Sequence, residues 1–229
     1  MMIKLKLIVF SLLLFCALTG LTRVKAQNTD VKLRLSAKVE KEISKKLSGS
    51  LEYEHRLDQN LSTFDKAFLE PSVSYDLNKS MKVGAVYRII LDQNKVREQG
   101  MEQRVAAYVR YSLEYDDFEF QVKTALQYGF DDLTNSSFSY DQKLISRTSL
   151  EVQYNWFGSK FTPFASAELF YHINDPKGGI INQTRMKAGT AYKISKSSKV
   201  QVYYLFENEF NVAYPVDAHI LGASYSFKF

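Results

Sequence analysis

Long segments in which apolar and polar side chains alternate constrain the fold of this chain more than any other feature. The alternation runs through residues 32–40, 102–115, 118–130 and 184–194. An extended strand projects successive side chains to opposite faces, so each segment predicts a strand with one apolar and one polar face. Most of these segments exceed the ~5–6 residues usual in globular strands and match the ~9–11 of a tilted membrane crossing.

The connections between the predicted strands alternate between short turns and longer loops. The short turns fall near 45–46, 78–80, 116–117, 158–159 and 195–198, and the longer polar loops at 59–66, 93–101, 131–143, 174–182 and 211–217. Outer-membrane barrels have short periplasmic turns and longer external loops. Because backbone amides in lipid need internal partners, the sheet must close on itself. We therefore predict an all-β, transmembrane, up-and-down antiparallel barrel that forms one domain over residues 27–229.

The strand number is left open by the sequence, at ten to twelve. Ten strands follow the turn at Lys45, and residues 31–43 add an N-terminal strand. That strand could be one of twelve if another was missed, could close the barrel in parallel, or could stay out of the wall. Pro71 favours a bulge or an edge within its strand, because proline cannot donate a ladder hydrogen bond.

The polar faces of the predicted strands would point into the lumen and give it charges of both signs. These luminal residues are Arg34, Glu52, Glu54, Arg56, Glu70, Arg88, Arg104, Arg110, Glu151, Glu168, Arg185, Glu207 and Glu209. A barrel of this size has an interior little wider than the eight-strand kind that side chains alone can fill. Structural ion pairs are therefore the first interpretation. The alternative is a narrow channel in which the same charges set selectivity.

Aromatic residues gather near both ends of the predicted strands. Tyr115 and Trp156 lie near short turns, and Tyr128 and Phe210 lie near loops. Two such belts are typical of the headgroup regions of a membrane. The competing interpretation is a soluble β-sandwich with an aromatic core, which the strand length disfavours.

The chain ends on an aromatic residue. Residues 219–229 alternate, with Tyr225, Phe227 and Phe229 on the mostly apolar face. This ending resembles the C-terminal signal of outer-membrane barrels, which implies barrel-insertion machinery as a partner. We expect an integral protein of the outer membrane of a Gram-negative bacterium, in contact with outer-membrane lipid.

Residues 1–26 have the features of a cleaved signal peptide. Lys4 and Lys6 precede an apolar stretch, and residues 24–26 fit a cleavage site. The apolar stretch is too short for a membrane helix, which takes ~20 residues. The alternative is a lipoprotein leader that uses Cys16, although Phe15 is large for the position before a lipidated cysteine.

Removal of this leader nearly neutralises the chain. The leader holds four of the 30 basic residues and none of the 25 acidic ones, which leaves 26 basic residues and a net charge of +1. Both signs are interleaved along the strands, whereas a nucleic-acid binder concentrates positive charge on one surface. Nucleic acid is therefore excluded as a partner. Cys16 leaves with the leader, so the mature chain can form no disulfide.

Three histidines are the candidates for catalysis or metal binding. His172 falls at a position of its predicted strand that would face the lumen, and it lies near Asp175. His55 and His219 fall at positions that would face the lipid. No serine forms a recognisable nucleophile motif with any of them. The histidines also lack the close spacing of zinc ligands. We therefore expect no enzymatic activity, no catalytic residue, no cofactor and no metal.

Several short motifs resemble the small outer-membrane barrels of Gram-negative bacteria classed as domains of unknown function. They are Tyr87-Arg88 after an Asn-Lys turn, Glu168-Leu169-Phe170, Arg185 early in the next strand, and residues 219–229. The resemblance covers the mature chain, implies a barrel in the outer membrane and supplies no catalytic residues. The expected role is structural or loop-presenting. The second hypothesis is a narrow, porin-like solute channel, and the third is a lipid-modifying enzyme.

Overall fold

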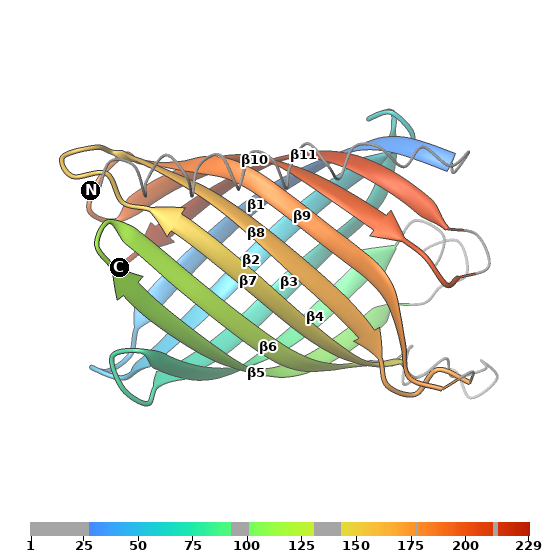
Figure 1. Ribbon diagram of the computed structural model, residues 1–229, viewed down its shortest axis with the longest axis horizontal. Helices are drawn as coiled ribbons and strands as arrows, with labels where there is room; N and C mark the ends of the chain where they lie inside the picture. Colours follow the sequence, from blue (N-terminus) through green and yellow to red (C-terminus); the bar gives the residue numbers. More distant parts are fainter. Residues whose placement is uncertain (1–27, 93–100, 131–142, 177, 213–214) are drawn as a thin grey trace, which may run out of the picture.

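The predicted strands form along most of the chain in the computed structural model, which describes residues 28–92, 101–130, 143–176, 178–212 and 215–229 (Figure 1). Within these residues there are eleven strands of 12–15 residues. They are β1 (Asn28–Glu42), β2 (Leu47–Asp58), β3 (Thr63–Asp76), β4 (Met81–Asp92), β5 (Glu102–Tyr115), β6 (Phe118–Phe130), β7 (Lys143–Tyr154), β8 (Phe161–His172), β9 (Ile180–Lys193), β10 (Ser198–Glu209) and β11 (Val216–Lys228). The expected signal peptide lies outside the described residues. No described helix has the length and apolar character needed to cross a membrane.

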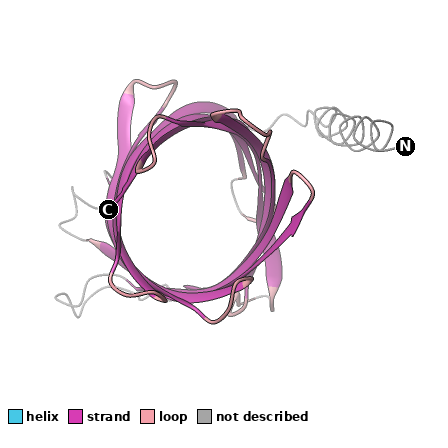
Figure 2. Ribbon diagram, turned by 90° about the vertical axis from the view of Figure 1, so that its left-hand side faces the viewer, coloured by secondary structure: helices cyan, strands magenta, loops and turns pink. Residues whose placement is uncertain are grey.

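The strands close into one barrel, which confirms the predicted fold (Figure 2). Consecutive strands pair antiparallel, and the barrel closes between β1 and β11, which pair in parallel from Asn28 opposite Val216 to Glu40 opposite Lys228. Of the three arrangements left open by the sequence, the parallel closing strand is the one observed. In an up-and-down sheet with an odd number of strands, the first and last strands run in the same direction, so the closing pair must be parallel.

The two ends of the barrel differ. The short turns and Phe229 lie at one end, on the left in Figure 1, and Asn28 lies at the opposite end with the longer connections. The Phe229 backbone amide donates a hydrogen bond to the Glu40 carbonyl oxygen at 3.0 Å. Thus the first and last strands of the wall bring the two ends of the described chain to opposite mouths.

The predicted loop over residues 59–66 is wrong, because only 59–62 connect β2 to β3. Gln59, Asn60 and Leu61 have φ angles of 48°, 56° and 68°, in the left-handed region. This backbone reverses the chain tightly, so Asp65 and the residues after it belong to β3. Polar residues near the mouth of a barrel resemble a loop in sequence although they continue a strand.

Pro71 interrupts one ladder, but neither the bulge nor the sheet edge that the sequence favours there is formed. Between β3 and β4, the pairing stops after Leu69 opposite Ile89 and resumes at Ser72 opposite Val86. On its other side, Pro71 lies opposite Leu51 of β2. The missing amide donor of proline therefore weakens one edge of β3 without breaking the barrel.

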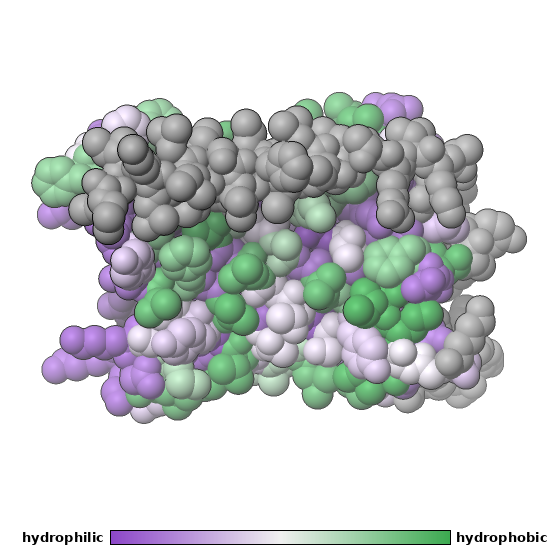
Figure 3. Space-filling view, in the orientation of Figure 1, coloured by the Kyte–Doolittle hydropathy of each residue, from purple (hydrophilic) through white to green (hydrophobic). Residues whose placement is uncertain are grey.

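The two faces of the wall differ in polarity. On the outside, Leu126, Leu150, Met186 and Leu221 are each 51–54% exposed, and apolar side chains cover much of the visible wall (Figure 3). The charged and polar side chains of the same strands point into the lumen. A small apolar cluster formed by Leu205, Ala218 and Ile220 is an exception on the inner face.

Two tyrosines lie flat against the inner wall over glycines of a neighbouring strand. A Cβ atom on Gly222 would lie 2.0 Å from Cζ of Tyr203, and one on Gly84 would lie 2.5 Å from Cζ of Tyr108. Only glycine leaves room for these rings, a packing known to stabilise glycines in sheets. The rings therefore cover the wall and do not project across the lumen.

Replacing Gly222 by alanine is expected to destabilise the barrel by about 1–3 kcal/mol, because the added methyl displaces the Tyr203 ring from a packed position. The measurement is urea unfolding of the refolded barrel in lipid vesicles. Gly129→Ala is the matched control, since the nearest atom to its Cβ would be 3.8 Å away. Equal unfolding midpoints for the two variants would contradict this packing.

Candidate functional site

All seven arginines in the described part of the chain point into the lumen. They are Arg34, Arg56, Arg88, Arg104, Arg110, Arg147 and Arg185. The acidic residues predicted to be luminal lie on the same inner face: Glu52, Glu54, Glu70, Glu151, Glu168, Glu207 and Glu209. Arg34 is only 6% exposed and Glu207 only 8%, so the middle of the lumen holds buried charge.

A chain of ion pairs crosses half of the inner wall. It runs from Arg34 to Glu207 at 3.0 Å, to Arg185 at 2.5 Å, to Glu168 at 3.7 Å and to Arg147 at 2.8 Å. Arg34 reaches Glu207 across β11, where the intervening inner residues include Ala218. The small side chain of Ala218 leaves space for this contact. These pairs fit the structural filling that the sequence suggests first.

Arginines also stack on inward-facing phenylalanines. The guanidinium carbons of Arg56 and Arg88 lie 5.0 and 4.1 Å from the centre of the Phe68 ring. Arg147 and Arg185 of the ion-pair chain stack on Phe170 in the same way, with guanidinium carbons 4.8 and 4.5 Å from the centre of its ring. Arg88 also forms an ion pair with Glu70. These aromatic rings hold the arginine side chains along the wall.

Cations lie directly opposite cations on neighbouring strands at several inner positions. These pairs are Arg34–Arg56, Arg88–Arg104, Lys82–Arg110, Arg110–Lys123 and Lys193–Lys199. Two acidic pairs, Glu52–Glu70 and Glu114–Glu119, are also present. Like charges directly opposite each other destabilise a sheet, by roughly 0.2–1 kcal/mol in measured pairs. Several of these cations also bind a carboxylate of their own: Arg34, Arg56, Lys82, Arg88 and Arg104. Among the described residues, structural filling gives no reason for the pairs Arg110–Lys123 and Lys193–Lys199, in which neither member forms an ion pair with a carboxylate.

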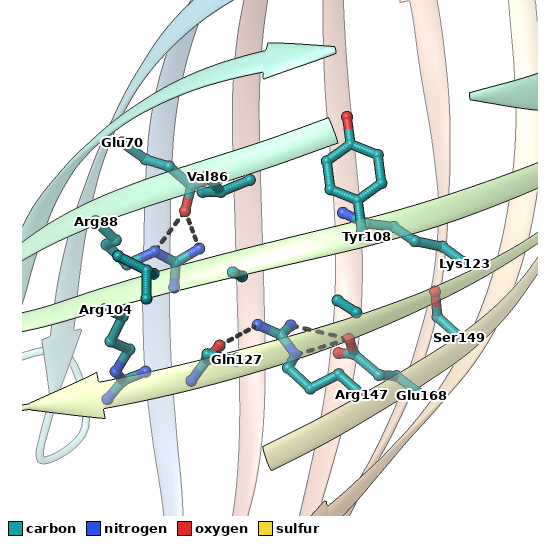
Figure 4. A pocket seen from close by; sticks show the side chains of 13 residues that line it. Glu70, Val86, Arg88, Arg104, Tyr108, Lys123, Gln127, Arg147, Ser149 and Glu168 are labelled. Atoms are coloured by element: carbon teal, nitrogen blue, oxygen red, sulfur yellow. Dashed lines mark hydrogen bonds and ion pairs between the residues drawn. The ribbon is translucent and has the colours of Figure 1, made fainter. Parts of the chain in front are cut away.

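A cavity of about 110 Å³ lies inside the barrel (Figure 4). Its cationic lining comes from Arg88, Arg104, Lys123 and Arg147, against the two carboxylates of Glu70 and Glu168. Both carboxylates already bind arginines of the lining. The hydroxyls of Tyr108 and Ser149 add hydrogen-bond donors. The cavity is therefore polar and carries more positive than negative charge.

A second, larger cavity of about 410 Å³ opens at the short-turn end of the lumen. Its charged lining is Lys38, Lys160, Lys193, Lys196, Lys199, Lys228 and a single acid, Glu40. The remaining lining is largely hydroxyl and amide side chains. This lysine-rich mouth leads toward the arginines of the middle of the lumen, so positive charge extends along the inner wall.

The three histidines take the faces predicted for them. His172 lies on the inner face opposite Ile145, whereas His55 and His219 face outward, next to the hydroxyls of Tyr53 and Tyr204. In the described ranges, no three side chains of the metal-ligating types come together.

Several inner charges that were not predicted from the sequence lie together in the structure. Arg147, Lys123 and Lys187 lie on the inner face, and Lys187 forms an ion pair with Glu151 at 3.6 Å. The alternation within 118–130 and 184–194 carried the signal for both lysines. Because side chains two residues apart in a strand face the same side, inward-facing neighbours would have identified these lysines.

Comparison with known proteins identifies a family but no activity. Residues 34–216 match a family described as "Protein of unknown function (DUF2490)". No curated protein matches the chain in sequence. Among solved structures, a rhombohedral crystal form of the NanC porin is similar, with 14% identity and a TM-score of 0.49, covering 77% of this chain and 86% of that one.

Proposed function

This chain belongs to the DUF2490 family of proteins of unknown function, and we propose that it is a narrow, anion-selective channel of an outer membrane. One observation carries the proposal: inside the lumen, cations that have no carboxylate partner among the described residues lie opposite each other on neighbouring strands. Such pairs cost stability. A channel that conducts anions gives a reason to keep them, whereas a structural or loop-presenting role does not. The proposed activity is passive and includes no enzymatic step.

The distribution of charge supports a path for anions. The lysines around the short-turn mouth would raise the local concentration of anions, because a cleft lined by one sign of charge focuses the field. Farther in, arginines and Lys123 would offer successive weak sites. Conduction through a constriction needs binding that is favourable enough for entry and weak enough for exit. The acidic partners of many arginines keep each site from holding an anion too tightly.

The outer wall supports the membrane location. Its half-exposed leucines and its strands of 12–15 residues suit a lipid environment. Tyr225, Phe227 and Phe229, near the short-turn end, remain the proposed signal for barrel-insertion machinery. If the short turns are periplasmic, as in known barrels, the lysine-rich mouth opens to the periplasm and Asn28 lies at the cell surface.

Chloride entry into vesicles tests the proposed channel. The barrel of residues 27–229 is refolded into liposomes loaded with a chloride-quenched dye, and insertion is checked by a heat-dependent gel shift. We expect quenching well above that of protein-free liposomes. Liposomes that contain inserted barrel but take up chloride no faster than empty ones would contradict the channel and return the structural role to first place.

The proposed orientation predicts which turns are accessible on intact cells. An epitope inserted between Asn60 and Leu61 is expected to bind antibody without permeabilisation, whereas one inserted in the turn over residues 77–80 is expected to bind only after it. Surface labelling followed by flow cytometry measures both. Labelling in the opposite pattern would show that the short turns lie outside.

A further inference from the structure

Two inner cations lack the negative partner that their neighbours have. Arg110 of β5 lies directly opposite Lys123 of β6. In the part of the chain that the structure describes, no carboxylate lies within ion-pair distance of either side chain, and Nε of Arg110 is buried without a hydrogen-bond acceptor. Most other inner cations in the middle of the lumen form an ion pair with a carboxylate, as Lys187 does with Glu151.

The residues directly opposite this cation pair do not supply an unpaired negative charge, and the two carboxylates of the cavity lining, Glu70 and Glu168, are each bound to an arginine. The residue opposite Arg110 on its other side is Lys82, which pairs with Asp76 at 3.2 Å, and the residue opposite Lys123 on its other side is Ser149. A half-buried charge without a partner is costly, because the protein interior solvates it poorly. Two such charges of the same sign, next to each other, call for an anion.

Both cations lie near the ring of Tyr108 at the inner wall. Nζ of Lys123 lies 4.3 Å from the centre of this ring, and the guanidinium carbon of Arg110 lies 5.7 Å from it. Lys123, Tyr108 and Ser149 all line the cavity of about 110 Å³ (Figure 4). A water needs roughly 10–15 Å³ of such space, so the cavity has room for an ion of a few heavy atoms.

We propose that this cavity is a binding site for a small oxyanion, of the size of inorganic phosphate, held by Lys123 with the hydroxyl of Ser149, the residue opposite it on β7. Arg110, near the Tyr108 ring, and Arg104, at another part of the lining, add positive potential. Ammonium and hydroxyl donors suit an oxyanion, which accepts several hydrogen bonds at once. The inference deepens the proposed function by naming a class of solute, and its biological role rests on that function.

Calorimetric titration tests the site without any conductance. Inorganic phosphate is titrated into the refolded barrel of residues 27–229 in a phosphate-free detergent, at fixed chloride concentration. Saturable binding is expected for the wild type. We expect at least about tenfold weaker binding for Lys123→Gln, because a charge-assisted bond to the anion is worth more than ~1.4 kcal/mol. Arg110→Gln is expected to weaken binding less.

Lys187→Gln is the matched control, because Lys187 is also an inner lysine but is already paired with Glu151. Its affinity for phosphate is expected to equal that of the wild type, and Lys123→Arg is expected to retain binding if Lys123→Gln fails to fold. The site would be overturned if the wild type showed no saturable phosphate binding, or if Lys123→Gln and Lys187→Gln lost affinity equally. Phosphate binding without chloride conduction would support the site and contradict the channel. Chloride conduction without phosphate binding would support the channel and contradict the site.

Discussion

Replacing Glu207 by glutamine is expected to destabilise the barrel by about 3–5 kcal/mol, because it leaves the buried guanidinium group of Arg34 without its carboxylate. Glu207 binds Arg34 at 3.0 Å and Arg185 at 2.5 Å, and its side chain is only 11% exposed. Arg34 would have no other ion-pair partner among the described residues. Urea unfolding in lipid vesicles measures the change as a lower midpoint.

Glu40→Gln is the control for this substitution. Glu40 lies on the inner face near the short-turn mouth, is about one-third exposed, and pairs with Lys38 and Lys228 only at 3.9–4.0 Å. Exposed pairs of this kind contribute roughly 0–1 kcal/mol. If Glu207→Gln unfolded at the same urea concentration as Glu40→Gln, the ion-pair chain would not stabilise the barrel.

Replacing both Arg110 and Lys123 by glutamate is expected to reverse the ion selectivity of the channel. The change puts two negative charges where two unpaired positive charges lie. A charge acts on an ion 4 Å away with about 4 kcal/mol at an effective dielectric constant of ~20, and each 1.4 kcal/mol is a factor of ten. Even with screening, the ratio of chloride to potassium permeability should fall by at least about tenfold.

Lys79→Glu controls for a charge reversal outside the lumen, since Lys79 is exposed in the turn between β3 and β4. Its permeability ratio is expected to match that of the wild type. Reversal potentials of single inserted barrels measure all three proteins. A double variant that stays as anion-selective as the wild type would remove Arg110 and Lys123 from the conduction path.

The faces and much of the register of the wall follow from local pattern. In β6, the alternation of residues 118–130 predicts which side chains point inward. The two-residue turn at Asp116–Asp117 also places Tyr115 opposite Phe118, and therefore Arg110 opposite Lys123. The two-residue alternation and the tight turn are thus enough to predict the pair Arg110–Lys123, because both are local features of neighbouring segments of the chain.

The closure of the barrel and the ion-pair chain could not be predicted in this way. Parity places Arg34 and Glu207 on the inner face, but their contact requires the parallel pairing of β1 with β11. It also requires a small residue, Ala218, between them. Strands that are distant in sequence meet only when the whole sheet closes, so no local pattern reports their register.

The most direct test of the channel is the reversal potential of a single wild-type barrel in a planar bilayer that separates two KCl concentrations. An anion-selective lumen predicts discrete current steps and a reversal potential shifted toward the chloride equilibrium potential. A shift toward the potassium equilibrium potential, or a silent membrane in which insertion is verified, would contradict it.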